Sequence, residues 1–209
     1  MKMLFADEQF DYLLKKCRDI EDPAGADSHH VDRVGNLSHK IASALGLNPE
    51  LAWQLGLAAR IHDIGKTLIR PDILGKPGRL SLTEFELVQK HTIIGEAIIS
   101  ALDNDLVFDL AGKIALSHHE RWDGSGYPHG LRGKDIPISA RIAAVADNLD
   151  ALTHKRQYKD AWPAEAVMKF LVRESGKRFD PEIIRIIAAR LYEFLPHTKN
   201  DSFQGEDRG

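Results

Sequence analysis

The sequence predicts an all-α protein, a single domain of about eight helices, and three observations lead to this prediction. Apolar residues recur at the 3.6-residue period of an amphipathic helix through most of the 209-residue chain. Runs that alternate apolar and polar residues, as half-buried strands do, are nearly absent. The length suits one domain or two, but no stretch resembles an interdomain linker, so we expect one domain over residues 1–209.

Caps and turn residues set the boundaries of the expected helices. Gly46 and Gly65 each follow an apolar helical run, as glycines that cap helix C-termini do. Residues 81–84 (Ser-Leu-Thr-Glu) form a capping-box pattern, and Pro163 and Pro181 stand where a proline in the first helical turn is tolerated. The expected helices are 7–20, 29–46, 50–64, 82–101, 106–120, 138–153, 163–176 and 181–195.

Two segments interrupt this helical pattern. Prolines and glycines predict a loop over residues 67–80 and a longer one over residues 121–137. A loop as long as the second is usually either functional or disordered. Within the single domain, we expect an N-terminal helix in residues 1–21, the core in residues 22–195 and a disordered polar tail in residues 196–209.

Composition excludes several classes of function. The net charge of -3 gives no general attraction to nucleic acid or to an anionic membrane, so any phosphate binding needs a local site. No apolar run is long enough to span a membrane, and the N-terminus has no signal-peptide pattern. Cys17 is the one cysteine, which excludes an intrachain disulfide and a cysteine-based zinc site. We expect a cytoplasmic protein without nucleic-acid or membrane partners.

The chain has ten histidines, and their helical positions indicate a metal site. A single histidine on an apolar helix face is more often a hydrogen-bonded core residue than a metal ligand. Here five expected helices each carry a histidine or an aspartate on the inward face. A buried carboxylate is costly unless it is paired or binds a cation, and imidazoles with carboxylates suit a divalent transition metal. These five residues are His30, His62, His91, His118 and Asp147.

Two adjacent pairs, His62-Asp63 and His118-His119, indicate more than one metal. Neighbouring residues project about 100° apart on a helix, so each pair can straddle two positions. The two oxygens of Asp63 can bridge two metals. Paired metals about 3.5–4 Å apart are an established arrangement for phosphoester hydrolysis.

Two sequence blocks carry a family resemblance. Residues 62–66 (His-Asp-Ile-Gly-Lys) resemble the signature of the HD superfamily of metal-dependent phosphohydrolases. Residues 118–128 (His-His-Glu-Arg-Trp-Asp-Gly-Ser-Gly-Tyr-Pro) are more specific and resemble the HD-GYP subfamily, bacterial phosphodiesterases of cyclic di-GMP. The resemblance covers residues 28–185, with further matches at 30–34, 91–95, 130–142, 147–153, 156–159 and 179–181.

The resemblance implies an HD-type helical domain around two metal ions that Asp63 and a hydroxide bridge. Some relatives hold a third metal through a glutamate at the position of Ala26, so we expect two ions here. Iron or manganese is favoured, and nickel, cobalt or zinc would also suit the ligands. The residues implied for one metal are His62, Asp63 and Asp147, with His30 close or ligating, and those implied for the other are Asp63, His91, His118 and His119.

The resemblance also implies residues that contact substrate. Lys66, alternatively a solvated lysine near a helix end, would contact the scissile phosphate or the leaving oxygen. Arg156 and Lys159, alternatively a solvated charged face, would bind substrate phosphates. Tyr127 belongs to the 121–137 loop, which either shapes the site, docks a signalling protein or only seals helix ends. Arg33 and Asp150 would contact substrate or support the ligands. We expect surface or packing roles for His29, His39, His129, His154 and His197.

The expected function is therefore metal-dependent hydrolysis of cyclic di-GMP to linear pGpG, with further cleavage to GMP. The bridging hydroxide would attack phosphorus in line, and Lys66 or a metal-bound water would assist the departing 3′-oxygen. Asp63 and Lys66 are thus the expected catalytic residues. Two alternatives stay open: an HD phosphohydrolase of other nucleotides or cyclic dinucleotides, and a non-catalytic cyclic di-GMP sensor or adaptor. A homodimer is also open.

Overall fold

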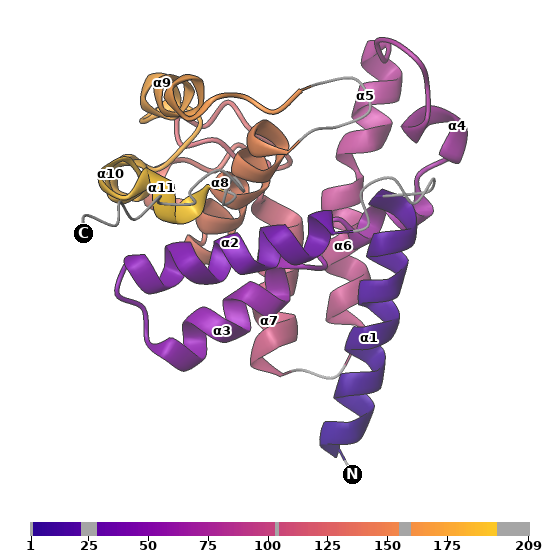
Figure 1. The fold of residues 1–209 in the computed structure, drawn as a ribbon. Helices are drawn as coiled ribbons and strands as arrows, with labels where there is room; N and C mark the ends of the chain where they lie inside the picture. The colour runs from indigo at the N-terminus through magenta and orange to yellow at the C-terminus, as the bar shows by residue number, and fades with distance from the viewer. Residues whose placement is uncertain (1, 22–28, 103–104, 155–159, 196–209) are drawn as a thin grey trace, which may run out of the picture.

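The computed structural model describes residues 2–21, 29–102, 105–154 and 160–195 (Figure 1). Within these ranges the regular secondary structure is helical, with turns and loops between the helices, and the one β-bridge pairs Ser175 with Phe179 without forming a strand. The all-α prediction is confirmed. The predictions about Ala26, Arg156, Lys159, His197 and the 196–209 tail lie outside the described residues.

The described helices, in chain order, follow the expected sequence of elements with several additions. They are α1 (Lys2–Glu21), α2 (His30–Ala44), α3 (Pro49–Ala59), the 3₁₀-helix η1 (Ile64–Leu68), α4 (Pro71–Leu74), α5 (Leu82–Gln89), α6 (His91–Ser100), α7 (Leu106–Ser117), the 3₁₀-helix η2 (Gly133–Asp135), α8 (Ile138–Thr153), α9 (Ala164–Glu174), α10 (Pro181–Ala189) and α11 (Leu191–Phe194).

Several predicted caps are confirmed. Gly46 follows α2 with a φ of 79°, a value that favours glycine, and its N–H donates to a carbonyl at the end of that helix. The Ser81 hydroxyl accepts a hydrogen bond from the Glu84 N–H, while the Glu84 carboxylate accepts one from the Ser81 N–H, which completes the capping box. Pro181 is the first residue of α10, and helix α8 has the expected bounds.

Three expected helices are interrupted or shortened in the structure. The helix expected over 50–64 ends at Ala59, so Gly65 lies within η1 and does not cap α3. The helix expected over 82–101 breaks at Lys90 into α5 and α6. The one expected over 181–195 breaks at Arg190, where φ is -139°. The expected 67–80 loop contains α4.

The core lies where α2, α3, α7 and α8 pack together (Figure 1). Helices α2 and α3 form one adjacent pair, and α6 and α7 form another. Fully buried aliphatic side chains such as Ile41, Leu55, Ile114, Ile142 and Leu149 fill the space between them. Helices α9 to α11 pack at the α8 end, and α4 and α5 extend from the opposite side. This framework holds the ends of α2, α6 and α7 close together beside α8.

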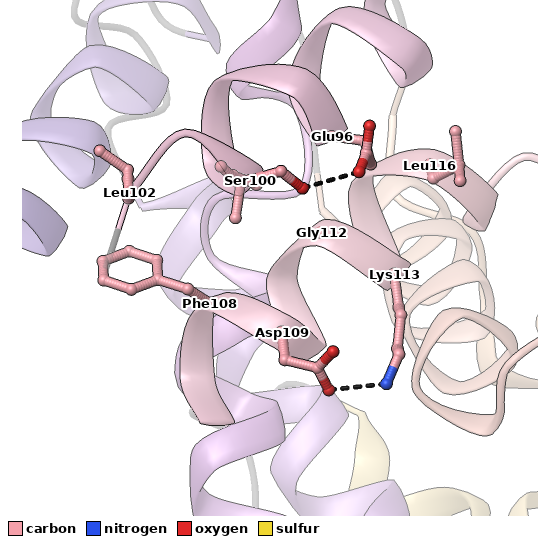
Figure 2. Close-up of a pocket in the computed structure, with 9 residues that line it drawn as sticks. Glu96, Ser100, Leu102, Phe108, Asp109, Gly112, Lys113 and Leu116 are labelled. Carbon is pink, nitrogen blue, oxygen red and sulfur yellow. Dashed lines mark hydrogen bonds and ion pairs between the residues drawn. The ribbon is translucent and has the colours of Figure 1, made fainter. Parts of the chain in front are cut away.

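A cavity of about 370 Å³ lies along α6 and α7 (Figure 2). The Glu96 carboxylate accepts a hydrogen bond from Ser100 at 2.7 Å, and Asp109 pairs with Lys113 at 2.6 Å. None of the expected site residues that the structure describes lines this cavity. None of the described helices combines the length and apolar character that crossing a membrane requires.

Candidate metal centre

The expected ligands converge into two groups. Within each group, one ligand atom from every residue lies within 4.8 Å of the ligand atoms of the others. The structure therefore brings together, from separate helices, the side chains that the sequence marks as metal ligands. The first group is Asp63, His91, His118 and His119, and the second is His30, His62 and Asp147.

Most of these side chains lie at helix ends. His30 and His91 are the first residues of α2 and α6, and His118 caps the C-terminus of α7. His62 lies in the turn between α3 and η1, so its expected position on a helix face is wrong. Asp147 alone projects from the middle of a helix, α8. Because the helix ends at Ala59, the backbone of the following turn can direct both His62 and Asp63 at the same centre.

Asp63 is the point at which the two groups meet. Its Oδ2 lies 3.1 Å from His62 Nε2, and its Oδ1 lies 3.2 Å from His91 Nε2 and 3.6 Å from His118 Nε2. In the second group, His30 Nε2 lies 3.7 Å from Asp147 Oδ1. Each Asp63 oxygen thus faces one group, which is the geometry that a bridging carboxylate requires.

Gly65 allows this close approach. A Cβ atom at Gly65 would lie 1.9 Å from the His91 carbonyl oxygen and 2.6 Å from the Gly95 nitrogen. Both neighbours are backbone atoms, which cannot move aside as a flexible side chain can. Only glycine therefore lets η1 pack against the start of α6, and this contact sets the distance between Asp63 and His91.

Backbone carbonyls orient the imidazole rings. The Nδ1 atoms of His62, His91 and His118 lie 2.9, 2.6 and 3.0 Å from a carbonyl oxygen three or four residues earlier. Because a carbonyl oxygen only accepts, Nδ1 must carry the hydrogen in each ring. The Nε2 lone pair then points to the centre of the cluster, as in metal-ligating histidines.

Buried polar atoms without hydrogen bonds test whether a metal fits here. Within the described ranges, the Nε2 atoms of His91 and His118 and the Oδ1 of Asp63 are buried and lack a hydrogen-bond partner. One such atom typically costs about 1–3 kcal/mol. Three of them aimed at one point, all acceptors or anionic, match a divalent cation bound by imidazole and carboxylate. The residues therefore fit a metal centre.

The electrostatics hold these side chains in their metal-binding protonation states. Burial alone would raise the pKa of Asp63, but the positive charge of Lys66, followed by His62, holds that pKa well below its usual value. Burial lowers the pKa of His118, and burial together with the neighbouring His118 lowers the pKa of His119 far below its usual value. A deprotonated carboxylate and neutral imidazoles are the forms that bind metal.

Asp150 supports His30 from behind. Its carboxylate is fully buried, lies 2.6 Å from His30 Nδ1 and accepts hydrogen bonds from Arg33. His154 Nδ1 lies 3.0 Å from the other Asp150 oxygen. Burial opposes the charged form, yet hydrogen bonds from His154, His30 and Arg33 hold the Asp150 pKa far below its usual value. The structure thus places Asp150 where it can orient the ligand candidate His30, one of the two roles expected for it.

His154 was expected to have only a surface or packing role, and the structure corrects this. It follows α8 and stands four residues after Asp150, a spacing at which residues of one helix face meet. That spacing is the sequence signal that could have identified the contact.

Lys66 lies beside the bridging carboxylate. Its Nζ is 2.7 Å from Asp63 Oδ2, and the side chain is mostly buried in η1. This position places the Lys66 amino group at the edge of the cluster, where it can meet a substrate phosphate or a leaving oxygen.

The 121–137 loop packs against the cluster through Tyr127. The Tyr127 ring stacks on His119, with ring centroids 4.8 Å apart, and meets the edge of Phe85 from α5. Burial raises the pKa of the Tyr127 hydroxyl above its usual value, so the phenol stays protonated. The stacking of Tyr127 on His119 is therefore a contact through which this loop can shape the site, one of the roles expected for it.

Glu120 and Arg178 are residues near the site that sequence reasoning missed. Glu120 is buried, and its two oxygens accept hydrogen bonds from the N–H groups of His129 and Leu131, which ties down the loop. The position of Glu120 directly after the histidine pair is the signal that could have found it. Burial lowers the pKa of Arg178, and the positive charge of Arg121 lowers it further. No local pattern marks Arg178.

Comparison with known proteins identifies a family. A model of the HD domain family matches residues 17–183. A cyclic di-GMP phosphodiesterase of Thermotoga maritima is 44% identical over 82% of the chain and 45% of its own length. A 3′3′-cGAMP-specific phosphodiesterase 2 of Vibrio cholerae is 41% identical over 79% of the chain and 32% of its own length. The chain thus spans less than half of either relative.

The fold agrees with a solved structure as well. Bd1817, described as an HDG"Y"P protein from Bdellovibrio bacteriovorus, matches with a TM-score of 0.60 and 27% identity, over 78% of the chain and 52% of its own. The family model covers most of the chain, and the matched region contains every ligand candidate in the two groups. The chain belongs to the HD domain family, as its resemblance to the HD-GYP subfamily predicts.

Proposed function

We propose that this chain is a metal-dependent phosphodiesterase that hydrolyses a cyclic dinucleotide, with cyclic di-GMP as the substrate. The observation that carries the proposal is the meeting of two ligand groups at the Asp63 carboxylate. The similarity to the Thermotoga maritima phosphodiesterase supports the choice of substrate. The complete set of ligand candidates also favours catalysis over a sensor or adaptor without turnover.

Two divalent ions are proposed to bind at this centre, with iron or manganese favoured. His30, His62 and Asp147 would hold one ion, His91, His118 and His119 the other, and Asp63 both. Such ions would supply Lewis acidity toward the phosphoryl oxygens and lower the pKa of water.

Other roles in binding and catalysis would belong to side chains of the protein. Asp63, whose pKa is lowered by the neighbouring charge of Lys66, is the deprotonated carboxylate that both ions would share. Lys66 holds its proton at Nζ and donates it to the departing 3′-oxygen as the ester bond breaks. Tyr127 covers one face of His119 and keeps water from that ring. Arg156 and Lys159 are proposed, from the family resemblance, to bind the substrate phosphates.

Cleavage of one ester bond would give linear pGpG, and cleavage of the second would give GMP. A second candidate substrate is 3′3′-cGAMP, because a 41% identical relative is named as specific for it. A cytoplasmic location, a homodimer and a signalling partner that docks on the 121–137 loop stay predictions from the sequence.

A turnover assay tests the proposal. The protein is loaded with Mn²⁺ or anaerobically with Fe²⁺, incubated separately with cyclic di-GMP, 3′3′-cGAMP and cyclic di-AMP, and the products are separated by chromatography. We expect pGpG from cyclic di-GMP and none from the Asp63→Ala variant. Binding of cyclic di-GMP without turnover under every metal condition would favour the sensor alternative and overturn the proposal.

A further inference from the structure

A second and larger cavity opens beside the candidate metal centre. Its volume is about 780 Å³, and its walls come from α1 on one side and from η1 and α4 on the other. Figure 1 shows the C-terminal end of α1 close to these elements. Lys66 lines the cavity, and its Nζ lies 2.7 Å from Asp63. The cavity is therefore adjacent to the cluster of metal-ligand candidates.

The cavity has the size and character of a small-molecule site. Ligand pockets typically measure about 300–1,000 Å³ and combine apolar walls with a few polar groups. Here the aliphatic side chains of Ile20, Ile69 and Leu74 provide apolar surface on both sides. A flat aromatic ring between these side chains would be removed from water on both faces, as a nucleobase in a binding pocket is.

The polar groups on the α1 wall complement one particular base. Lys16 and Asp19 both line the cavity and stand three residues apart, so they lie on the same face of α1. The lysine presents hydrogen-bond donors and the aspartate presents acceptors. Guanine offers the reverse set, with acceptors at O6 and N7 and donors at N1 and N2. Adenine carries a donor at N6 in place of the O6 acceptor, so it matches this pair less well.

We propose that the cavity between α1 and η1–α4 is a guanine-binding subsite, in which Asp19 accepts from the N1 and N2 donors and Lys16 donates to O6. This inference rests on the proposed function, since it assigns one base of the cyclic dinucleotide to the cavity. A phosphate at the metal centre, next to Lys66, would place the attached nucleoside at the cavity mouth.

The subsite would make α1 a determinant of specificity. The HD domain model matches residues 17–183, so Lys16 and most of α1 precede it. The ligand cluster lies within the region that the family model matches. Most of α1 lies outside that region, and in this proposal α1 selects the purine base.

Substitutions on α1 test the proposal, measured on the full chain loaded with Mn²⁺. Asp19 is exposed, so Asp19→Ala is expected to fold normally, and Asp11→Ala, an exposed aspartate of the same helix that does not line the cavity, is the matched control. We expect Asp19→Ala to lower kcat/KM for cyclic di-GMP about 10-fold, mostly through KM. Hydrolysis of bis(p-nitrophenyl) phosphate, which has no base, should be unchanged.

A second variant reads out selectivity directly. Asp19→Asn replaces one acceptor oxygen with an NH₂ donor at constant size, so the ratio of kcat/KM for cyclic di-GMP over cyclic di-AMP should fall more than kcat itself.

The outcomes separate this inference from the proposed function. If the wild-type chain hydrolyses no cyclic dinucleotide, the proposed function fails, and the subsite falls with it. If the wild type is active but both Asp19 variants match Asp11→Ala on every substrate, the subsite alone is wrong. Equal losses on cyclic di-GMP and on bis(p-nitrophenyl) phosphate would also overturn it, because they would indicate damage to the metal centre.

Discussion

At the scale of single residues, the carboxylate of Asp63 connects the whole site. Its two oxygens face different histidines, and Lys66 lies against it. An anion this deeply buried needs compensating positive charge, which Lys66 supplies beside Oδ2 and which a metal ion would supply at Oδ1. Substitution of Asp63 should therefore remove both metal binding and activity. Substitution of Lys66 should lower activity alone, and substitution of Asp150 should weaken metal affinity.

Asp63→Ala should remove both metal binding and activity, because it deletes the proposed bridge between the two ligand groups. We expect most bound metal to be lost and turnover of cyclic di-GMP to fall below detection, measured by elemental analysis and product chromatography on the same sample. Normal hydrolysis by this variant would show that Asp63 does not bridge.

Lys66→Ala should separate metal binding from catalysis. The lysine lies beside the cluster without belonging to either ligand group, so metal content should stay at the wild-type level. Loss of a positioned proton donor typically costs about 10²–10⁴-fold in rate. Lys113→Ala, which removes a lysine from an exposed pair on α7, is the control and should keep full activity. An unchanged kcat in Lys66→Ala would show that this lysine is not the proton donor.

Asp150→Asn should weaken metal binding without abolishing it. The substitution removes the negative charge that orients His30, and loss of such supporting groups typically costs about 10–100-fold in metal affinity. Titration with Mn²⁺ or Zn²⁺ against a competing chelator measures the effect. Asp180→Asn, a buried aspartate paired with Arg141, is the matched control. Equal affinities in both variants would mean that Asp150 only stabilises the fold.

At the scale of helices and turns, the sequence identifies which segments are helical better than where they end. Local periodicity predicted α8 to the residue, since that helix is uninterrupted and packed along its length. It did not predict the end of α3 at Ala59, after which the chain turns and packs Gly65 against the start of α6, a contact between segments distant in sequence. The break at Lys90 likewise accompanies a bond from His91 to the Val88 carbonyl.

Gly65→Ala tests the contact that shapes this turn. The new Cβ would overlap backbone atoms of α6, so we expect a loss of about 1–3 kcal/mol in the free energy of unfolding, together with reduced metal binding. Gly112→Ala in α7 is the control: its Cβ would meet only a side-chain carbon at 3.8 Å. That variant should be neutral or more stable by about 0.5–1 kcal/mol. Urea denaturation compares the two, and equal stabilities would contradict the close-packing argument.

At the scale of the whole molecule, the fold assembles a site that no segment contains alone. The ligand candidates come from five places in the chain between His30 and Asp147, and the packing of the helices brings them within reach of one another. The sequence identified these residues because histidine and aspartate are unusual on inward faces. It did not reveal the cavity beside α1, which forms between segments distant in sequence. The contacts of Glu120 and His154 are local in the chain, and their sequence signals were overlooked.

The number of metal ions bound per chain tests the central claim most directly. Protein produced with manganese or iron supplied in excess, and purified without chelators, would be analysed for metal and for protein concentration on one sample. The two ligand groups that meet at Asp63 predict two ions per chain. A value near zero in a folded sample, verified by its helical circular dichroism, would contradict the claim that these side chains form a metal centre.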